Sequence, residues 1–192
     1  GCLHAASTTT WEMSSYQDFV RGRFSGISLD RDGRLTLAPT VSPVFVSGQA
    51  AIWSVARGPD GSLYAGTGHG GMVYEIPPSG AAKLLWKADR PEVFALAVSP
   101  HGALYAATSP DGKVFRIENG KATEFFDPHA KYIWALCVAP DGTLFVGTGA
   151  QGEIFRVDKT GRGEKYYSTG QSHVTSLAVD TQGRLLAGTE PN

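Results

Sequence analysis

Short apolar segments that recur at intervals of 40 or 41 residues predict an all-β chain, a β-propeller with four-stranded antiparallel blades. Similar segments begin at Ile52, Val93, Ile133 and Val174, and a spacing of about 40 residues is that of a propeller blade. β-Branched and aromatic residues fill these segments, and Asp-Gly and Gly-Gly pairs, typical of hairpin turns, separate them. No segment has a sustained helical period, so the repeats are expected to be made of strands alone.

The unit that begins at Ile52 shows the expected order of strands. Strand a covers Ile52 to Arg57 and is followed by a Pro-Asp-Gly turn. Strand b covers Leu63 to Thr67, strand c Met72 to Ile76, and strand d Lys83 to Lys87. The names a, b, c and d are used below for the corresponding strands of every unit.

The stretch between strands b and c contains a G-x-G-x-x-G pattern at Gly66, Gly68 and Gly71. A dinucleotide-binding loop requires a helix after these glycines, because the helix N-terminus meets the pyrophosphate. Here the strand-like sequence MVYEI follows, and a second match at Gly147 to Gly152 precedes EIFRV. The pattern therefore predicts a b–c hairpin, and no bound cofactor is expected.

Strand a is apolar on both of its alternating faces. Strict alternation places Ile52, Ser54 and Ala56 on one face, with Val93, Ala95, Ala97, Ile133, Ala135 and Cys137 in the other units. The opposite face carries larger side chains: Trp53, Val55, Phe94, Leu96, Val98, Trp134, Leu136 and Val138. A large face packed on the small face of the next blade fills the space between them, so Trp53, Phe94 and Trp134 are predicted to lie in the inter-blade core. Arg57 replaces the valine of the other units and is interpreted as an edge residue or as a charge that lines the channel.

The ends of the chain predict an incomplete, truncated propeller. The first segment offers strands at Phe24 to Leu29, Arg34 to Ala38 and Val44 to Val46, and the last unit offers strands a and b. Residues 1–20 are expected to be a leader remnant or a disordered N-terminus. Blades are expected over residues 21–192: a partial blade over 24–49, full blades over 52–89, 93–129 and 133–169, and a partial blade over 174–192.

Composition argues against two kinds of partner. Lys and Arg total 17 against 18 Asp and Glu, without a basic block, so nucleic acid is not expected. No apolar run has the length of a transmembrane helix. The N-terminal GCLHAASTTT resembles the end of a secretory leader, and Gly1-Cys2 resembles a lipoprotein signal with a lipid anchor on Cys2; an ordinary disordered terminus is the third interpretation. Export to the periplasm, the cell surface or the medium is the favoured location, and Cys137 is expected to be a buried free thiol.

The repeats resemble those of bacterial β-propellers of the NHL and two-component-regulator-propeller kinds. LAVDTQGRLLAGT, Leu177 to Thr189, is similar to the NHL pattern of a strand ending in Asp, a Gly turn and a second strand. GTLFVGTGAQGEIFRV, Gly142 to Val157, is similar to the regulator-propeller pattern, with Phe145 where Trp is usual. The Gly-His and Trp-Asp signature of WD repeats is absent. The resemblance implies a propeller that presents its surface to ligands or partners.

The motifs of common catalytic and metal sites are missing from the sequence. The histidines lack the spacing of a zinc helix, and no G-x-S-x-G nucleophile motif exists. Asp30 to Gly33 resembles the start of a calcium loop, but the later ligands do not follow. No catalytic, cofactor-binding or metal-binding residue is therefore assigned.

Propeller geometry nevertheless indicates one candidate binding face. The d–a connections and b–c hairpins lie at one end of the blades, and the uniform a–b turns lie at the other. Variable loops on a rigid scaffold are where binding usually occurs. The candidate binding face comprises residues just before strand a and residues at the b–c tips: His69, Glu92, Asp111, Tyr132, Gln151 and His173.

The favoured function is a non-catalytic scaffold for a protein or small-molecule ligand, exported and part of a longer chain. The alternatives are a lactonase-like, metal-dependent hydrolase and the sensor ectodomain of a signalling protein.

Overall fold

The computed structural model describes residues 12 and 14–191, which belong to two compact units, residues 1–44 and 45–192. The first unit contains helix α1 (Tyr16–Val20) and a hairpin of β1 (Ile27–Leu29) and β2 (Leu35–Leu37). The helix, which the sequence pattern did not predict, is capped by Ser15, whose hydroxyl oxygen accepts a hydrogen bond from the Asp18 amide at 3.3 Å.

The expectation of three strands in the first segment was wrong in part. β1 and β2 form, but residues 44–46 carry no strand. Val44 and Val46 are exposed, and no other strand pairs with the β1–β2 sheet in the described chain. A strand persists only where a neighbour pairs with its backbone groups, so an apolar run with no such neighbour stays irregular.

The second unit consists of three four-stranded antiparallel sheets and one two-stranded sheet, with strands in chain order within each sheet. The first sheet is β3 (Ala51–Arg57), β4 (Leu63–Gly68), β5 (Met72–Ile76) and β6 (Lys83–Lys87). The second is β7 (Glu92–Val98), β8 (Leu104–Ser109), β9 (Gly112–Glu118) and β10 (Lys121–Ala130). The third is β11 (Ile133–Val138), β12 (Leu144–Thr148), β13 (Glu153–Val157) and β14 (Gly163–Ser168). The fourth is β15 (His173–Val179) and β16 (Leu185–Glu190).

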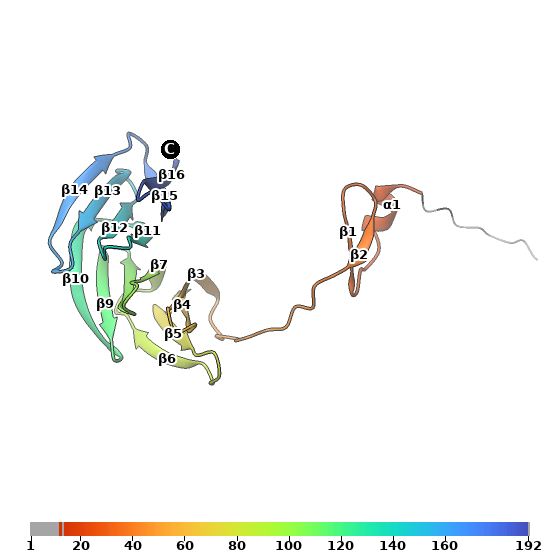
Figure 1. Cartoon of the computed structure of the whole chain (residues 1–192), viewed down its shortest axis with the longest axis horizontal. Helices are drawn as coiled ribbons and strands as arrows, with labels where there is room; N and C mark the ends of the chain where they lie inside the picture. The colour runs from red at the N-terminus through yellow and green to blue at the C-terminus, as the bar shows by residue number, and fades with distance from the viewer. Residues whose placement is uncertain (1–11, 13, 192) are drawn as a thin grey trace, which may run out of the picture. The chain divides into compact units, whose positions relative to one another are not determined.

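The four sheets are arranged as neighbouring blades in an open arc. The a strands β3, β7, β11 and β15 lie next to one another on the inner side, and β6, β10 and β14 lie on the outer side (Figure 1). The all-β prediction with four-stranded antiparallel blades is confirmed, and the described arc is a partial propeller. Strand β5 follows Gly71 and β13 follows Gly152, so both G-x-G-x-x-G stretches are hairpins.

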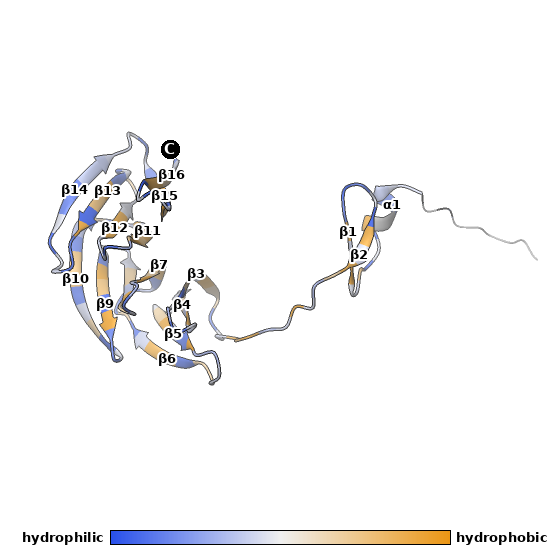
Figure 2. Cartoon of the chain, in the orientation of Figure 1, coloured by the Kyte–Doolittle hydropathy of each residue, from blue (hydrophilic) through white to orange (hydrophobic). Residues whose placement is uncertain are grey.

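The core lies between successive blades. One buried cluster joins Val73 of the first blade to Val93 and Leu96 of the second, and another joins Ala95 and Ala97 of the second to residues of the third. Burial of these faces removes apolar surface from water, which stabilises the fold by about 25 cal/mol per Å². The outer strands β10 and β14 are mostly hydrophilic, whereas β9 combines hydrophobic and charged residues (Figure 2).

Candidate functional site

Each a strand contains a β-bulge at the same position, and the bulge redirects one side chain on the inner surface of the arc. The pairing between strands a and b shifts between Ile52 and Ser54 in the first blade and between Val93 and Ala95 in the second. The same shift occurs at the corresponding positions in the third and fourth blades, which are Ile133/Ala135 and Val174/Ser176. A bulge inserts one unpaired residue and redirects its side chain. The unpaired residues are Trp53, Phe94, Trp134 and Thr175.

The three aromatic side chains contact neighbouring blades, but the prediction that they are buried in the inter-blade core was wrong. Trp53 is 49% exposed, and Phe94 and Trp134 are only half-buried. Strict alternation also placed Val93 with Ala95, whereas Val93 packs with Leu96. Because a bulge adds one residue to one strand only, it reverses the alternation on one side of the insertion.

Trp53, Phe94 and Trp134 form a continuous series across three blades, termed here the aromatic row. The ring centroids of Trp53 and Phe94 are 5.6 Å apart, and those of Phe94 and Trp134 are 4.5 Å apart, both tilted. Tyr132 stacks on Trp134 at 5.1 Å with an interplanar angle of 21°, and the Nζ of Lys131 lies 5.1 Å from the Tyr132 ring centroid. The row therefore presents partly exposed rings beside the starts of the a strands.

Glu92 and His173 connect each blade to the one before it in the same way. The Trp53 Nε1 donates to Glu92 Oε2 at 2.6 Å, and the His69 backbone amide donates to Glu92 Oε1 at 3.3 Å. The Trp134 Nε1 donates to His173 Nδ1 at 3.2 Å, and the Ala150 amide donates to the same atom at 3.3 Å. The residue that opens strand a thus accepts one indole and one backbone N–H from the preceding blade, an arrangement termed here the inter-blade clasp.

The second blade lacks both donors of the clasp, and its partner residue differs accordingly. Phe94 replaces the tryptophan, and Pro110, which has no N–H, occupies the place of His69 and Ala150. The residue just before the next a strand is Tyr132, which stacks on Trp134 instead of accepting these bonds. Among these blades of the described chain, a side-chain acceptor such as Glu92 or His173 therefore occurs only where the preceding blade supplies both an indole N–H and a backbone N–H.

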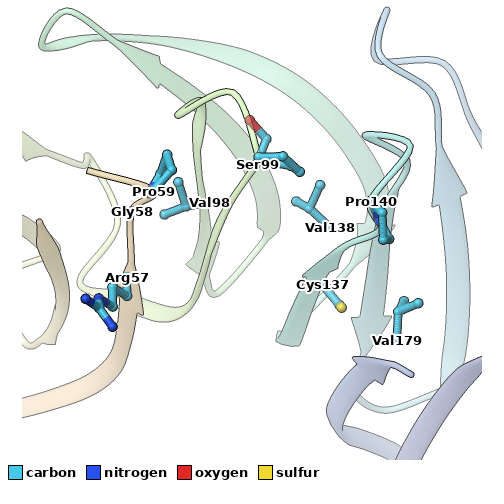
Figure 3. Close-up of a pocket in the computed structure, with 10 residues that line it drawn as sticks. Arg57, Gly58, Pro59, Val98, Ser99, Cys137, Val138, Pro140 and Val179 are labelled. Atoms are coloured by element: carbon cyan, nitrogen blue, oxygen red, sulfur yellow. The ribbon is translucent and has the colours of Figure 1, made fainter. Parts of the chain in front are cut away.

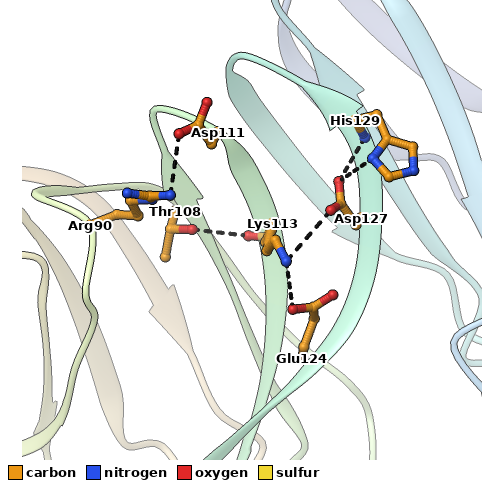
Figure 4. A network of polar contacts seen from close by, with 7 residues as sticks. All are labelled: Arg90, Thr108, Asp111, Lys113, Glu124, Asp127 and His129. Carbon is orange, nitrogen blue, oxygen red and sulfur yellow. Dashed lines mark hydrogen bonds and ion pairs between the residues drawn. The ribbon is translucent and has the colours of Figure 1, made fainter.

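The residues at the b–c tips have fewer contacts with this site. The His69 Nδ1 lies 3.0 Å from Glu92 Oε1, and the His69 ring is 67% exposed. Asp111 pairs with Arg90 at 3.2 Å, beside a group in which Lys113 contacts Glu124 at 2.7 Å and Asp127 at 3.6 Å (Figure 4). Gln151 is exposed.

The structure thus brings together four of the six residues of the candidate binding face, in two groups. Glu92 contacts His69, whereas Tyr132 and His173 both contact Trp134. Asp111 and Gln151 belong to neither group. Sequence reasoning missed the aromatic row as part of this surface, although an aromatic residue at the same position of three repeats was a usable signal.

The described part of the chain holds neither a cluster of metal ligands nor a membrane-spanning helix. Within residues 12 and 14–191, no three His, Cys, Asp or Glu side chains gather closely enough to hold a metal ion. A search of the same residues finds no helix with the length and apolar character needed to cross a bilayer. Cys2 and its proposed lipid anchor lie outside the described residues.

Sequence comparison finds one family match. The model of the family "WD domain, G-beta repeat" matches residues 120–157, from the end of the β9–β10 turn to the end of β13. A search of curated proteins finds no significant match.

Structural comparison finds β-propeller proteins. Virginiamycin B lyase from Staphylococcus aureus is 15% identical with a TM-score of 0.64, over 84% of this chain and 55% of that chain. A gluconolactonase from Xanthomonas campestris is 18% identical with a TM-score of 0.62, over 86% and 62%. A chain of the nidogen/laminin complex is 12% identical with a TM-score of 0.68, over 85% and 65%.

These likenesses establish the fold class. The chain spans between about half and two thirds of the length of the three solved chains. At such low identity the similarity shows the fold alone. Together with the repeat match, it defines the chain as a β-propeller repeat protein.

Proposed function

We propose that the protein is a non-catalytic propeller scaffold that binds a protein or small-molecule ligand on the face formed by the d–a connections and b–c hairpins. The observation that carries this proposal is the aromatic row, in which a repeated bulge leaves large rings accessible. Tyr and Trp rings supply much contact area at little cost in conformational entropy, and they are common anchors of binding surfaces. The proposed surface adds Trp53, Phe94 and Trp134 to the candidate binding face.

The clasp supports this proposal because it fixes the rings before a ligand arrives. Trp53 and Trp134 are each held by an indole hydrogen bond and by a neighbouring ring. A surface that is already ordered loses less entropy on binding. Hydrogen bonds also join the first and third hairpins to the adjoining d–a connections: the Gly71 amide donates to the Pro91 carbonyl oxygen at 2.8 Å, and the Thr169 amide donates to the Gly152 carbonyl oxygen at 3.1 Å.

The finer parts of the proposal rest on the sequence. The NHL and regulator-propeller subtype is supported by the stretches Leu177 to Thr189 and Gly142 to Val157. Export is supported by the N-terminal residues GCLHAASTTT, and the proposal treats the chain as one part of a longer protein.

The test uses arrays of defined peptides and oligosaccharides as probes, with the 192-residue chain and three variants of it. Tyr132→Ala and Trp134→Ala change the aromatic row and its stacked neighbour, whereas Tyr167→Ala removes a 59% exposed tyrosine of β14 and serves as the control. We expect selective probe binding that falls about tenfold in the first two variants and is unchanged in the control. Circular dichroism must show that all the variants remain folded. Equal binding by all variants would refute the proposed surface.

A further inference from the structure

His173 is the acceptor of the inter-blade clasp between the third and fourth blades, and its two donors determine which ring nitrogen carries the proton. The Trp134 Nε1 lies 3.2 Å from His173 Nδ1, and the Ala150 amide nitrogen lies 3.3 Å from the same atom. An indole N–H and a backbone N–H can only donate, so Nδ1 must be the unprotonated nitrogen of the ring. The single proton of the neutral imidazole is therefore on Nε2.

A second proton can then add only to Nδ1 of His173. This step converts the acceptor of the clasp into a donor that faces two other N–H donors. Both hydrogen bonds must break, and the charged ring must turn away from Trp134 and Ala150. Histidine is the side chain whose charge ordinarily changes between about pH 5 and pH 8, so the clasp is exposed to this change under mild acid.

The clasp between the first and second blades has a different response because its acceptor is a carboxylate. Glu92 accepts the Trp53 indole N–H on Oε2 and the His69 amide N–H on Oε1. Glutamate side chains ordinarily stay ionised throughout the range in which histidine titrates. The His69 Nδ1 lies 3.0 Å from Glu92 Oε1, and a protonated His69 ring still donates to that oxygen. Equivalent positions of the second and fourth blades thus hold acceptors with opposite sensitivity to acid.

The surroundings of His173 give its charged form little compensation. In the described chain, the histidines within ion-pair distance of a carboxylate are His69 and His129, and His173 is not among them. The charged and titratable groups on the elements packed against β15 are Lys131, Tyr132, Cys137, Glu153 and Glu190.

None of these five groups is placed to hold a charged His173 ring in the clasp. Cys137 lies beside Val179, at the other end of β15 (Figure 3), and Glu153 pairs with Lys165 at 2.8 Å. Glu190 is the register partner of His173 on β16, but it is exposed, so solvent and salt screen its attraction.

We propose that His173 makes the junction between the third and fourth blades sensitive to pH: a proton taken up on Nδ1 opens this clasp and releases the Trp134 ring, while the Glu92 clasp stays closed. The b–c hairpin itself stays attached, because the Gly149 amide donates to the Tyr132 carbonyl oxygen at 2.9 Å. The change is therefore local to the Trp134 end of the aromatic row. It concerns the order of the row and not what binds there, so it stands independently of the function proposed above.

The test follows the 192-residue chain by nuclear magnetic resonance from about pH 8 to about pH 5. Long-range proton–nitrogen correlation spectra identify the protonated nitrogen of His173, and the indole N–H signals of Trp134 and Trp53 report on the two clasps. The main variant is His173→Glu, which installs the residue that the second blade holds at the equivalent position. His101→Gln, at an exposed a–b turn at the other end of the blades, is the matched control.

We expect neutral His173 to carry its proton on Nε2. As His173 gains its second proton, the protection factor of the Trp134 indole N–H against hydrogen exchange should fall about tenfold, whereas that of Trp53 should not change. His173→Glu should abolish this response, because its carboxylate accepts the same donors without titrating in the range. His101→Gln should leave the response intact.

Three results would each overturn the proposal: a proton on Nδ1 of neutral His173, a Trp134 signal that does not follow His173 protonation, or the same pH response in His173→Glu. The first two measurements use the unmodified chain, so the test does not depend on the folding of the variant. Loss of both indole signals together with the β-sheet circular dichroism would show general acid unfolding and would also contradict a local change.

Discussion

At the scale of single residues, Glu92 shows how one side chain can order a surface and hold two blades together. Its carboxylate accepts an indole N–H and a backbone N–H from the preceding blade, and its side chain is only 15% exposed. A partly buried acceptor that loses its donors keeps the cost of desolvation without the compensating bond. The contribution of the inter-blade clasp should therefore appear as a coupling free energy between Trp53 and Glu92 in the stability of the protein.

A double-mutant cycle with Trp53→Phe and Glu92→Ala measures that coupling. Each single change should lower the free energy of unfolding, and the pair should lose about 1–2 kcal/mol less than the sum of the single losses. Urea unfolding of the four proteins provides the values. A strictly additive result would show that the 2.6 Å contact contributes no stability.

At the scale of elements, a loop glycine can be required by steric contact or by its backbone conformation alone. Sequence patterns do not separate these two reasons. Gly152 has a φ of +56°, and a Cβ there would overlap the carbonyl oxygen of Gln171 in the d–a connection. Gly170 has a φ of +71°, but a Cβ there would meet nothing within 4 Å. The two positions share the left-handed backbone and differ only in their surroundings.

Alanine at these two positions separates backbone strain from steric overlap. Gly170→Ala should cost about 1 kcal/mol of stability, the usual cost of a left-handed conformation for a residue with a side chain. Gly152→Ala should cost about 3 kcal/mol or more, because the hairpin must also move away from the Gln171 carbonyl. Denaturant unfolding measures both, and equal losses would contradict the close approach.

The aspartates of the turns make the hairpins sensitive to acid. The Thr160 hydroxyl donates to Asp158 Oδ1 at 2.6 Å, and this bond holds the pKa of the carboxyl below its ordinary value of 3.8. The unfolded chain therefore binds more protons in this range than the native chain. The stability from Asp158 is complete above about pH 3.8 and is lost as pH falls through the lowered native pKa.

Asp158→Asn tests this pH dependence, because asparagine keeps an oxygen acceptor but does not titrate. The variant should lose less stability than the unmodified chain between about pH 4 and pH 2. Urea unfolding at several pH values measures the difference. Glu190→Gln, at an exposed carboxylate outside the turns, is the control for a general loss of one carboxylate. Parallel acid profiles for Asp158→Asn and the unmodified chain would contradict the assignment.

At the scale of the whole molecule, the first, third and fourth blades of the arc carry exposed apolar side chains. Val55 of β3 is 64% exposed and Leu84 of β6 is 51% exposed, while Tyr167 of β14 and Leu186 of β16 are 59% and 54% exposed. Exposed apolar patches of this kind promote association. The chain should therefore associate as its concentration rises.

Sedimentation velocity over a range of concentrations tests this expectation. Val55→Lys should shift the equilibrium toward the monomer, because a charged side chain on the exposed face opposes its burial. Thr123→Lys, on the hydrophilic strand β10, should leave association unchanged. A monomer at all concentrations, or identical behaviour of the two variants, would contradict a role for this face.

Most strands could be predicted from sequence because each is marked locally. Apolar runs such as Leu63 to Thr67 predict a strand, and turn pairs such as Asp60-Gly61 predict a hairpin turn, without any knowledge of tertiary contacts. The short helix capped by Ser15 and the absent strand at residues 44–46 were not predicted, because five helical residues give little periodicity and a strand depends on a partner.

The sequence by itself determined the repeat, the order of strands within a blade and the end of the blades at which the variable loops meet. These follow from local conformational preferences and from a period that needs no knowledge of contacts. The tertiary structure alone decided that Trp53, Phe94 and Trp134 form a partly exposed row, and that Glu92 and His173 hold its two tryptophans. A bulge changes side-chain direction without changing residue types, and the row combines residues about 40 positions apart, so only the packing of one blade on the next could reveal it.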